Sequence, residues 1–328
     1  MTRSSDRLFS EEAYRQLYNP ALAPLWSAAE GLSPAEDGDH YTPERDFFEW
    51  WYFDATFTNG YHLVAILHSS LYNTVDHKPT VDIRVYPPQG PGWRGIGRFG
   101  RQEYRSASEH CDVCIGACQA RGKGSRYELY LRQGEIEAEL VFQGRVPGWK
   151  PGTGFLFADP SSGRYFRWVV PLPRAEVNGT LRLGGESIPV EGEGYHDHNW
   201  GNVVLADAFS HWYWGRFFAG EYTVVWGCLV APGPAPAYVT PFLLARNGEV
   251  LVDTEQIRIT AEAQTVEPST GAVYPRRLVI ETTDGHPVAC LVQEAHRVIE
   301  AVDFARPSFY NAFLRKMAET VFYLSRGR

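Results

Sequence analysis

The stretch Tyr127-Glu128-Leu129-Tyr130-Leu131 alternates as a strand with one buried face does, and Val250-Leu251-Val252-Asp253 repeats the pattern. The chain contains 31 glycines and 22 prolines, and 14% of its residues are aromatic. Apolar runs of strand length are separated by dipeptides typical of tight hairpins: Asn59-Gly60, Gly184-Gly185, Asn247-Gly248 and Asp284-Gly285. Another Asn-Gly pair stands at residues 178–179. We therefore predict an all-β protein made of barrels or sandwiches.

Helices are predicted only near the two ends of the chain. Residues 8–30 place apolar side chains at helical spacing, with interruptions at Pro20 and Pro24. Residues 307–328 show the same spacing and are basic within an acidic protein. This second helix is expected to cap a domain, and the alternative is an interfacial helix that rests on a membrane.

Length and charge limit the class of protein. A chain of 328 residues is long enough for two domains, which we place at residues 31–190 and 191–328, after a helical segment at 1–30. The net charge of −8 argues against a nucleic-acid partner, which requires a basic surface. No run of about 18 apolar residues is present, and Met1–Arg7 lacks the apolar core of a signal peptide. We expect a cytoplasmic protein, with peripheral membrane contact as the alternative.

The cysteines are interpreted as reduced structural thiols. Cys111, Cys114 and Cys118 form a C-x2-C-x3-C pattern, whereas Cys228 and Cys290 stand apart. A zinc site usually takes four ligands, often from two spaced pairs. If the segment is a strand, Cys114 and Cys118 share one face and Cys111 lies on the other. An odd number of cysteines argues against a secreted disulfide framework, and a metal or redox role is the alternative.

The segment Gly192-Glu193-Gly194-Tyr195-His196-Asp197-His198-Asn199-Trp200-Gly201 concentrates the side chains that can do chemistry. Its glycines are expected to let the backbone bend sharply. If the segment is extended, alternate side chains point to opposite faces. One face then holds Tyr195, Asp197 and Asn199, and the other holds His196, His198 and Trp200.

Asp197 is the candidate acid of this segment. Burial among aromatic rings raises the pKa of a carboxyl, so a neutral Asp197 could give a proton to an alkene, with His196 or His198 as its neighbour. The alternative is a structural carboxylate that accepts hydrogen bonds at a bend. The two histidines could also form half of a metal site, but no third ligand is close in sequence. We predict neither a metal nor another cofactor.

Two aromatic blocks could surround such an acid. Glu49 and Trp51 share one face of the predicted strand Glu49-Trp50-Trp51-Tyr52-Phe53-Asp54. Downstream, Trp212, Trp214 and Arg216 share a face, and each indole could stabilise a passing cation by about 0.5–2 kcal/mol. Arg216 could instead hold a carboxylate or diphosphate. Ordinary core packing is the alternative for both blocks.

Together these blocks resemble the carotenoid 1,2-hydratase (hydroxyneurosporene synthase) superfamily. The resemblance rests on Glu49–Ala55, Trp149–Gly154, Gly194–Gly201 and Trp212–Arg216, which follow one another in the family's order over about residues 45–230. Relatives of this superfamily include fungal decalin-forming Diels–Alderases. The resemblance implies two lipocalin-like β domains packed together, with the active site near their junction.

The resemblance also implies roles for individual residues. Asp197 would be the proton donor, His196 or His198 its partner, and Trp200 or Trp214 the neighbour of the cation. With Tyr195 these form the expected catalytic group; the expected substrate-binding residues are Trp200, Trp212, Trp214, Arg216, Trp51, Glu49, Asn199 and Trp226. The hydratases carry an aromatic residue where this chain has His196, which separates the chain from strict carotenoid hydration.

Three functions remain open at this point. The first is acid-initiated hydration or cyclisation of an isoprenoid alkene, which we favour because of the buried-acid cluster. The second is a cofactor-free pericyclase that folds a polyene by proximity and orientation. The third is a lipid-binding protein without catalysis. All three expect a hydrophobic small molecule as the partner.

Overall fold

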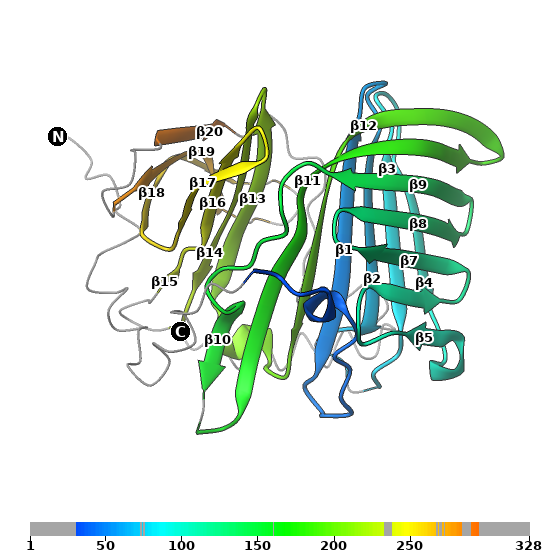
Figure 1. Cartoon of the computed structure of the whole chain (residues 1–328), viewed down its shortest axis with the longest axis horizontal. Coiled ribbons are helices and arrows are strands. Elements are labelled where there is room, and N and C mark those ends of the chain that lie inside the picture. Colours follow the sequence, from blue (N-terminus) through cyan, green and yellow to red (C-terminus); the bar gives the residue numbers. More distant parts are fainter. Residues whose placement is uncertain are drawn as a thin grey trace. The chain divides into compact units, whose positions relative to one another are not determined.

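The computed structural model describes residues 31–294 apart from 73, 75, 160, 233–237, 267, 269, 270, 272 and 284–289. Both predicted terminal helices and the predicted Asp284-Gly285 turn therefore lie outside the described residues. Residues up to Ile257 form one compact unit and residues from Arg258 another, and each is described by itself. The described elements are almost all strands, which confirms the all-β prediction (Figure 1).

The elements of the first unit begin with a large sheet. Its members and the short helices between them are η1 (Pro34–Asp37), β1 (Phe48–Phe57), β2 (His62–Ser70), β3 (Thr80–Tyr86), β4 (Trp93–Arg98), η2 (Arg101–Glu103), β5 (Tyr104–Ser106), β6 (Asp112–Ile115), β7 (Cys118–Lys123), β8 (Arg126–Gln133), β9 (Ile136–Gly144), β10 (Phe155–Asp159), β11 (Arg164–Leu183) and β12 (Glu186–Gly201).

Smaller sheets follow along the chain. One contains β13 (His211–Ala219), β14 (Tyr222–Val230), β15 (Tyr238–Val239), β16 (Phe242–Arg246) and β17 (Glu249–Thr254), after the short helix α3 (Leu205–Ala208). The last sheet contains β18 (Ile257–Val266), β19 (Val273–Thr282) and β20 (Cys290–Glu294). Within that sheet, Leu278 and Ile280 are buried and Arg277 forms an ion pair with Glu262.

The large sheet has twelve strands in the order β4-β3-β2-β1-β12-β11-β9-β8-β7-β6-β5, with β10 paired to β11. In Figure 1 the strands β7 to β9 cross in front of β1 to β3, so the sheet curls until its two halves face each other. This curling confirms the predicted barrel-type architecture. The predicted domain division at residues 190 and 191 falls within β12, and the division into two lipocalin-like domains stays a prediction.

Tight turns join the strands where the sequence predicts them. Gly184 and Gly185 have positive φ and connect β11 to β12, since Leu183 pairs with Glu186. Asn247 and Gly248 likewise have positive φ and connect β16 to β17. The pair at residues 178–179 instead lies inside β11, where a Cβ on Gly179 would come 1.9 Å from the Glu139 carbonyl oxygen. Glycine is required there by the close approach of a neighbouring strand.

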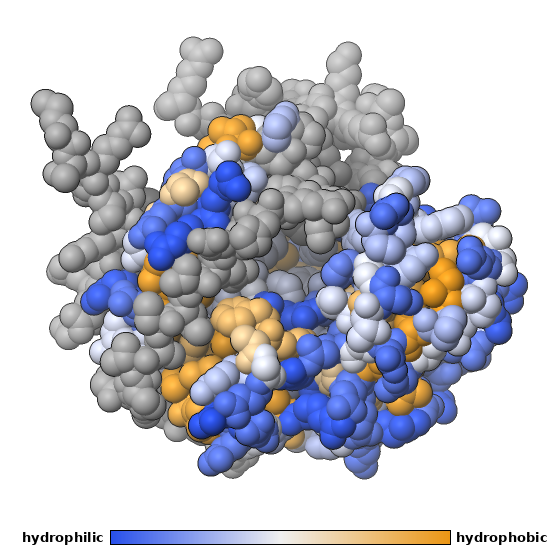
Figure 2. Space-filling model, turned by 90° about the horizontal axis from the view of Figure 1, so that it is seen from above, coloured by the Kyte–Doolittle hydropathy of each residue, from blue (hydrophilic) through white to orange (hydrophobic). Residues whose placement is uncertain are grey.

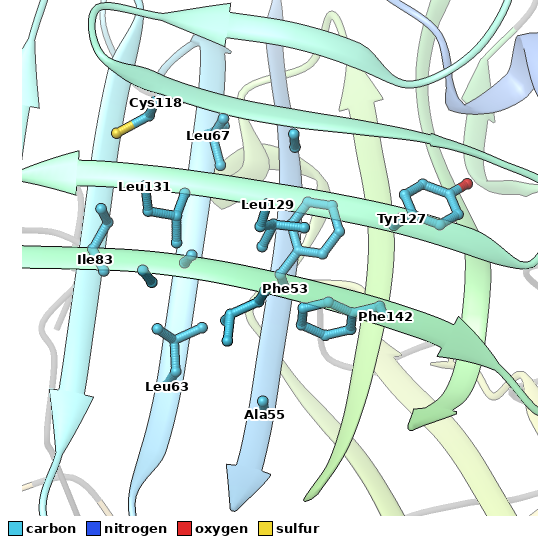
Figure 3. Packing of buried hydrophobic residues seen from close by; sticks show 14 of the residues in the cluster. Phe53, Ala55, Leu63, Leu67, Ile83, Cys118, Tyr127, Leu129, Leu131 and Phe142 are labelled. Atoms are coloured by element: carbon cyan, nitrogen blue, oxygen red, sulfur yellow. The ribbon is translucent and has the colours of Figure 1, made fainter. Parts of the chain in front are cut away.

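A hydrophobic core fills the space between the two halves of the curled sheet (Figure 3). Phe53, Leu63 and Ile83 reach it from β1 to β3, and Leu129 and Phe142 reach it from the crossing strands. Cys111 and Cys118 both lie in this core, while Cys114 is partly exposed. The predicted pairing of Cys114 with Cys118 on one face was therefore wrong, because a turn separates β6 from β7. Cys111, Cys114, Cys118 and Cys228 are all free thiols.

A second core covers the other side of β1, β11 and β12. It joins residues of these strands, such as Trp168 and Tyr195, to Val225, Leu229 and Leu243 of the five-stranded sheet. The pair β1–β12 is therefore covered on both faces. On the face seen in Figure 2, hydrophilic residues predominate and apolar residues show as smaller patches. Among the described residues, helices of the length and hydropathy needed to cross a membrane are absent.

Candidate active site

The antiparallel pairing of β1 with β12 brings the two quoted sequence blocks side by side. Glu49 lies opposite Trp200, Trp51 opposite His198 and Phe53 opposite His196. In the alternate positions, Tyr52 lies opposite Asp197 and Asp54 opposite Tyr195. Because directly opposite residues share a face, the pair has two polar faces. The inner face, toward the curled sheet's core, holds Glu49, Trp51, Phe53, His196, His198 and Trp200; the outer face, toward the five-stranded sheet, holds Tyr52, Asp54, Tyr195, Asp197 and Asn199.

Asp197 is the centre of the outer face. Its side chain is buried, and its two oxygens accept hydrogen bonds of 2.8 Å from the Tyr195 hydroxyl and from the Asn199 amide. Burial raises the pKa of Asp197 to about 7, against the opposing effect of hydrogen bonds from Tyr195 and Trp168. A carboxyl with this pKa is partly protonated at neutral pH, so it can act as a general acid.

An ion pair lies next to this acid. The Arg216 guanidinium of β13 binds both carboxylate oxygens of Asp54, and the Tyr52 hydroxyl donates to Asp54 Oδ2 at 3.1 Å. Both charged side chains are largely buried, at 15% and 9% exposed. The neighbouring Asp54 raises the pKa of Arg216 against the effect of burial, so this side chain stays charged. Arg216 is therefore paired with a carboxylate of the chain itself, and its expected role as an anchor for a substrate carboxylate or diphosphate stays a prediction.

Aromatic rings surround the same acid. The indole of Trp214 lies 5.3 Å from the Tyr195 ring and 5.6 Å from the Tyr52 ring, between centroids. Trp214 is 37% exposed and Trp212, on the same face of β13, is 42% exposed. The outer face thus combines a partly protonated carboxyl with aromatic rings, and one of these rings, Trp214, is partly exposed to solvent.

The inner face has separate partners. His196 stacks on Phe53 with 3.9 Å between centroids, and its Nε2 lies 3.2 Å from each carboxylate oxygen of Asp37. His198 stacks on Trp51, and its Nε2 lies 3.2 Å from Glu49 Oε1. Burial lowers the pKa of His198 well below the ordinary value, so this ring is neutral.

The predicted site residues therefore divide between the two faces. The prediction that Tyr195, Asp197 and Asn199 lie on one face of the strand and the two histidines on the other is confirmed. His196 and His198 point away from Asp197, so the expectation that either one is its direct partner was wrong. Glu49, Trp51 and Trp200 lie on the inner face with the histidines. Trp226 lies opposite Gly215 on the far side of β14 from Val225, so it does not line the outer face.

The glycines of the segment act through close approach rather than a bend. Gly192, Gly194 and Gly201 all lie within the continuous strand β12. A Cβ on Gly192 would come 2.1 Å from the Thr56 carbonyl oxygen, and one on Gly194 would come 2.7 Å from the Asp54 carbonyl oxygen. The prediction of a sharp bend was wrong; these glycines let β1 and the neighbouring strands pack against β12.

Sequence reasoning missed several residues of both faces. Tyr52 and Asp54 belong to the quoted first block, and only the β1–β12 register reveals that they lie beside Tyr195 and Asp197. Trp168 reaches the site from β11, where it pairs with Asn199. Asp37 reaches the inner face from η1, and no local pattern marks it as a partner of a residue more than 150 positions away.

The comparisons with known proteins agree with this architecture. Over 79% of this chain and 84% of the other, the fold matches an AttH structure from Nitrosomonas europaea with a TM-score of 0.60 and 18% sequence identity. Residues 94–298 match the AttH-like family, so the chain belongs to the AttH-like family.

Two curated relatives cover shorter stretches. The quinolone epoxide rearrangement protein penF of Penicillium thymicola is 27% identical over 149 residues, which are 43% of this chain and 40% of penF. The acyclic carotenoid 1,2-hydratase of Thiocapsa roseopersicina is 26% identical over 184 residues, which are 51% of this chain and 44% of the hydratase. The chain thus spans less than half the length of these relatives, and the second confirms the family resemblance seen in the sequence.

Proposed function

We propose that this protein is an enzyme that protonates an alkene or epoxide of a hydrophobic, isoprenoid-type small molecule. The observation that supports it best is Asp197, a buried carboxyl whose pKa is about 7 and whose oxygens accept two hydrogen bonds. A neutral acid can transfer its proton, and the donors then stabilise the carboxylate that forms. Positioned general acids contribute about 10²–10⁴-fold to rate.

In the proposed reaction the proton of Asp197 forms a C–H bond at an alkene carbon, or an O–H bond at an epoxide oxygen. The π electron pair forms the new C–H bond, or the electron pair of the breaking C–O bond stays on the epoxide oxygen, and in both cases an electron-deficient carbon remains. Water then adds to this carbon and returns one proton to the Asp197 carboxylate. Alternatively, a second alkene adds to close a ring, and the resulting cation loses a proton to the Asp197 carboxylate. In this proposal Trp214 and the Tyr52 ring stabilise the positive charge, by about 0.5–2 kcal/mol each, and their packing against each other and against Tyr195 supports that role.

The relatives support this chemistry in general form. One is named a carotenoid hydratase and the other a quinolone epoxide rearrangement protein, and both names are compatible with acid activation of a C=C or C–O bond. The pericyclase and the lipid-binding protein remain as the competing functions. Neither function requires an ionisable group at position 197, so the effect of substituting Asp197 distinguishes both of them from acid catalysis.

The test is incubation of the full chain with linear isoprenoids, polyenes and their epoxides in D₂O, followed by mass spectrometry. We expect one non-exchangeable deuterium in an alkene-derived product, and an added water if hydration follows. Asp197→Asn should lower the rate by about 10²–10⁴-fold. Asp112→Asn, on β6 and paired with Arg121, is the matched control and should leave it unchanged. An isomeric product without deuterium, formed equally by Asp197→Asn, would instead identify a pericyclase.

A further inference from the structure

A second cluster of reactive side chains lies on the inner face, away from Asp197. Asp37, Cys111 and His196 each place one potential ligand atom so that all three lie within 4.8 Å of one another. Their side chains are buried, with 2%, 0% and 0% of their residue surface exposed. Three elements far apart in sequence contribute them: η1, the residue before β6, and β12.

The hydrogen bonds of His196 show where the ring carries a proton. Nδ1 lies 2.9 Å from the Tyr52 carbonyl oxygen, which can only accept, so Nδ1 is protonated. Nε2 lies 3.2 Å from each oxygen of the Asp37 carboxylate. A cation shared between these atoms, either a proton on Nε2 or a metal ion, accounts for their close approach. A metal-binding histidine typically donates its other N–H to a carbonyl in this way.

His198 approaches the same carboxylate but lies outside this group of three. Its Nε2 lies 3.2 Å from Glu49 Oε1, which also accepts the His40 amide at 2.7 Å. Nδ1 is buried and has no hydrogen-bond partner within the part of the chain that the structure describes. It lies 3.5 Å from Asp37 Oδ1. The carboxylate of Asp37 therefore faces one nitrogen of each imidazole, and the Cys111 thiol completes the group formed with Asp37 and His196.

We propose that Asp37, Cys111 and His196 bind a zinc ion inside the curled sheet. Ligand atoms about 2.0–2.3 Å from a tetrahedral ion lie about 3.3–3.8 Å from one another, close to the 3.2 Å between His196 Nε2 and the Asp37 carboxylate. Thiolate and imidazole together favour zinc over magnesium or calcium. A carboxylate, a thiolate, one neutral ring and Zn²⁺ have no net charge, which suits a buried site.

The surroundings fit a structural rather than a catalytic ion. All three ligands are buried, so a substrate in solvent does not reach the ion. The Tyr127 hydroxyl donates to Asp37 Oδ2 at 2.5 Å and would orient that ligand. A cavity of about 260 Å³, lined by Asp37 and Tyr127 among others, adjoins the site on the side of Asp37. The ion would tie η1 and the β6 hairpin to the back of the strand that holds Asp197. This assignment departs from the metal-free protein expected from the sequence.

The test uses the full chain and needs no substrate. We expect about one zinc per chain after dialysis against zinc and removal of the excess, by elemental mass spectrometry. Cobalt(II) added to the metal-free protein should give the charge-transfer band of a cobalt–thiolate bond. Cys111→Ser should abolish this band, and His196→Gln should weaken cobalt binding by at least about 100-fold, more than outer-shell changes do.

Cys118→Ser is the matched control, because Cys118 is also buried in the same core and also donates to a backbone carbonyl, but it lies outside the group of ligand atoms. It should keep both the zinc and the band. Wild-type protein that binds neither metal would overturn the proposal and leave a buried imidazolium–carboxylate pair of His196 and Asp37. Equal loss of the band in both cysteine variants would also overturn it. If a variant does not fold by circular dichroism, the wild-type zinc content and cobalt spectrum still decide the question.

Discussion

His196 and Asp197 are neighbours in the chain, yet their side chains leave β12 on opposite faces and belong to different polar clusters. His196 faces Asp37 inside the curled sheet, while Asp197 accepts hydrogen bonds from Tyr195 and Asn199 under the five-stranded sheet. A single strand therefore positions the proposed acid on one side and the proposed zinc ligands on the other. Their effects can be separated experimentally, because substitutions on one face need not touch the other.

Activity should follow the protonated fraction of Asp197. Because the acid form is the active one and the pKa of Asp197 is about 7, kcat/KM should be constant at low pH. Above pH 7 it should fall about tenfold per pH unit, since each unit removes nine-tenths of the remaining acid form. The check is a pH–rate profile with the substrate found in D₂O. A profile that is flat through neutral pH would contradict Asp197 as the acid.

Asp197 should also make stability depend on pH. Its pKa is raised from 3.8 to about 7 on folding, so between these values the folded chain holds a proton that the unfolded chain has released. The free energy of unfolding should therefore fall as pH rises through this window, by about 1.4 kcal/mol per unit of pKa difference at most. Asp197→Asn removes this term. In urea titrations the variant should gain stability relative to wild type from about pH 4 to pH 7. If the free energies of unfolding of wild type and variant changed with pH in parallel, Asp197 would not have the raised pKa that we assign to it.

Tyr195→Phe should raise the pKa of Asp197 further. The variant loses the 2.8 Å hydrogen bond that favours the carboxylate, and a hydrogen bond to a charged group contributes about 1.5–3 kcal/mol. We expect the alkaline limb of the pH–rate profile to move up by about one to two units, with a lower maximum rate. Tyr130→Phe is the control, because Tyr130 is 48% exposed on β8. An unmoved limb in Tyr195→Phe would show that the hydroxyl does not tune the acid.

Arg216→Met should destabilise the protein because it leaves the buried carboxylate of Asp54 without its positively charged partner. Breaking one partner of a buried ion pair costs about 3–5 kcal/mol. The double variant Asp54→Asn/Arg216→Met should recover part of this loss, since no buried charge remains. Arg182→Met, which removes an exposed arginine beside Glu137 and Glu139, should cost about 1 kcal/mol or less. Equal costs for Arg216→Met and Arg182→Met, measured by urea unfolding, would argue against a buried pair.

Gly194→Ala should disturb both the fold and the site. The added Cβ would come 2.5 Å from Phe142 Cε1 and 2.6 Å from Val177 Cγ2, so the strands must shift. Overpacking of this kind costs about 1–3 kcal/mol. Because Tyr195 is the next residue, the acid should lose its hydrogen bond and the rate should fall with the stability. Gly31→Ala, where a Cβ meets nothing within 4 Å, should change neither.

Local sequence patterns were sufficient for much of the fold. The Gly184-Gly185 and Asn247-Gly248 turns lie where they were predicted, and the alternation of Tyr127–Leu131 places Leu129 and Leu131 in the core. Short-range patterns succeed here because a turn and a strand period depend on neighbouring residues only. The same logic gave the wrong faces for the cysteines, since the turn between β6 and β7 resets the alternation.

For the site, the sequence by itself determined the two faces of β12, because side chains of an extended strand must alternate. It could also single out Asp197 as a carboxyl among aromatic residues. Only the tertiary structure decided which partners each face meets. The β1–β12 register brought Tyr52 and Asp54 beside Asp197, β13 supplied Arg216 and Trp214, and η1 supplied Asp37. These contacts join residues up to 162 positions apart, and their geometry depends on how a sheet curls and packs, which no local pattern specifies.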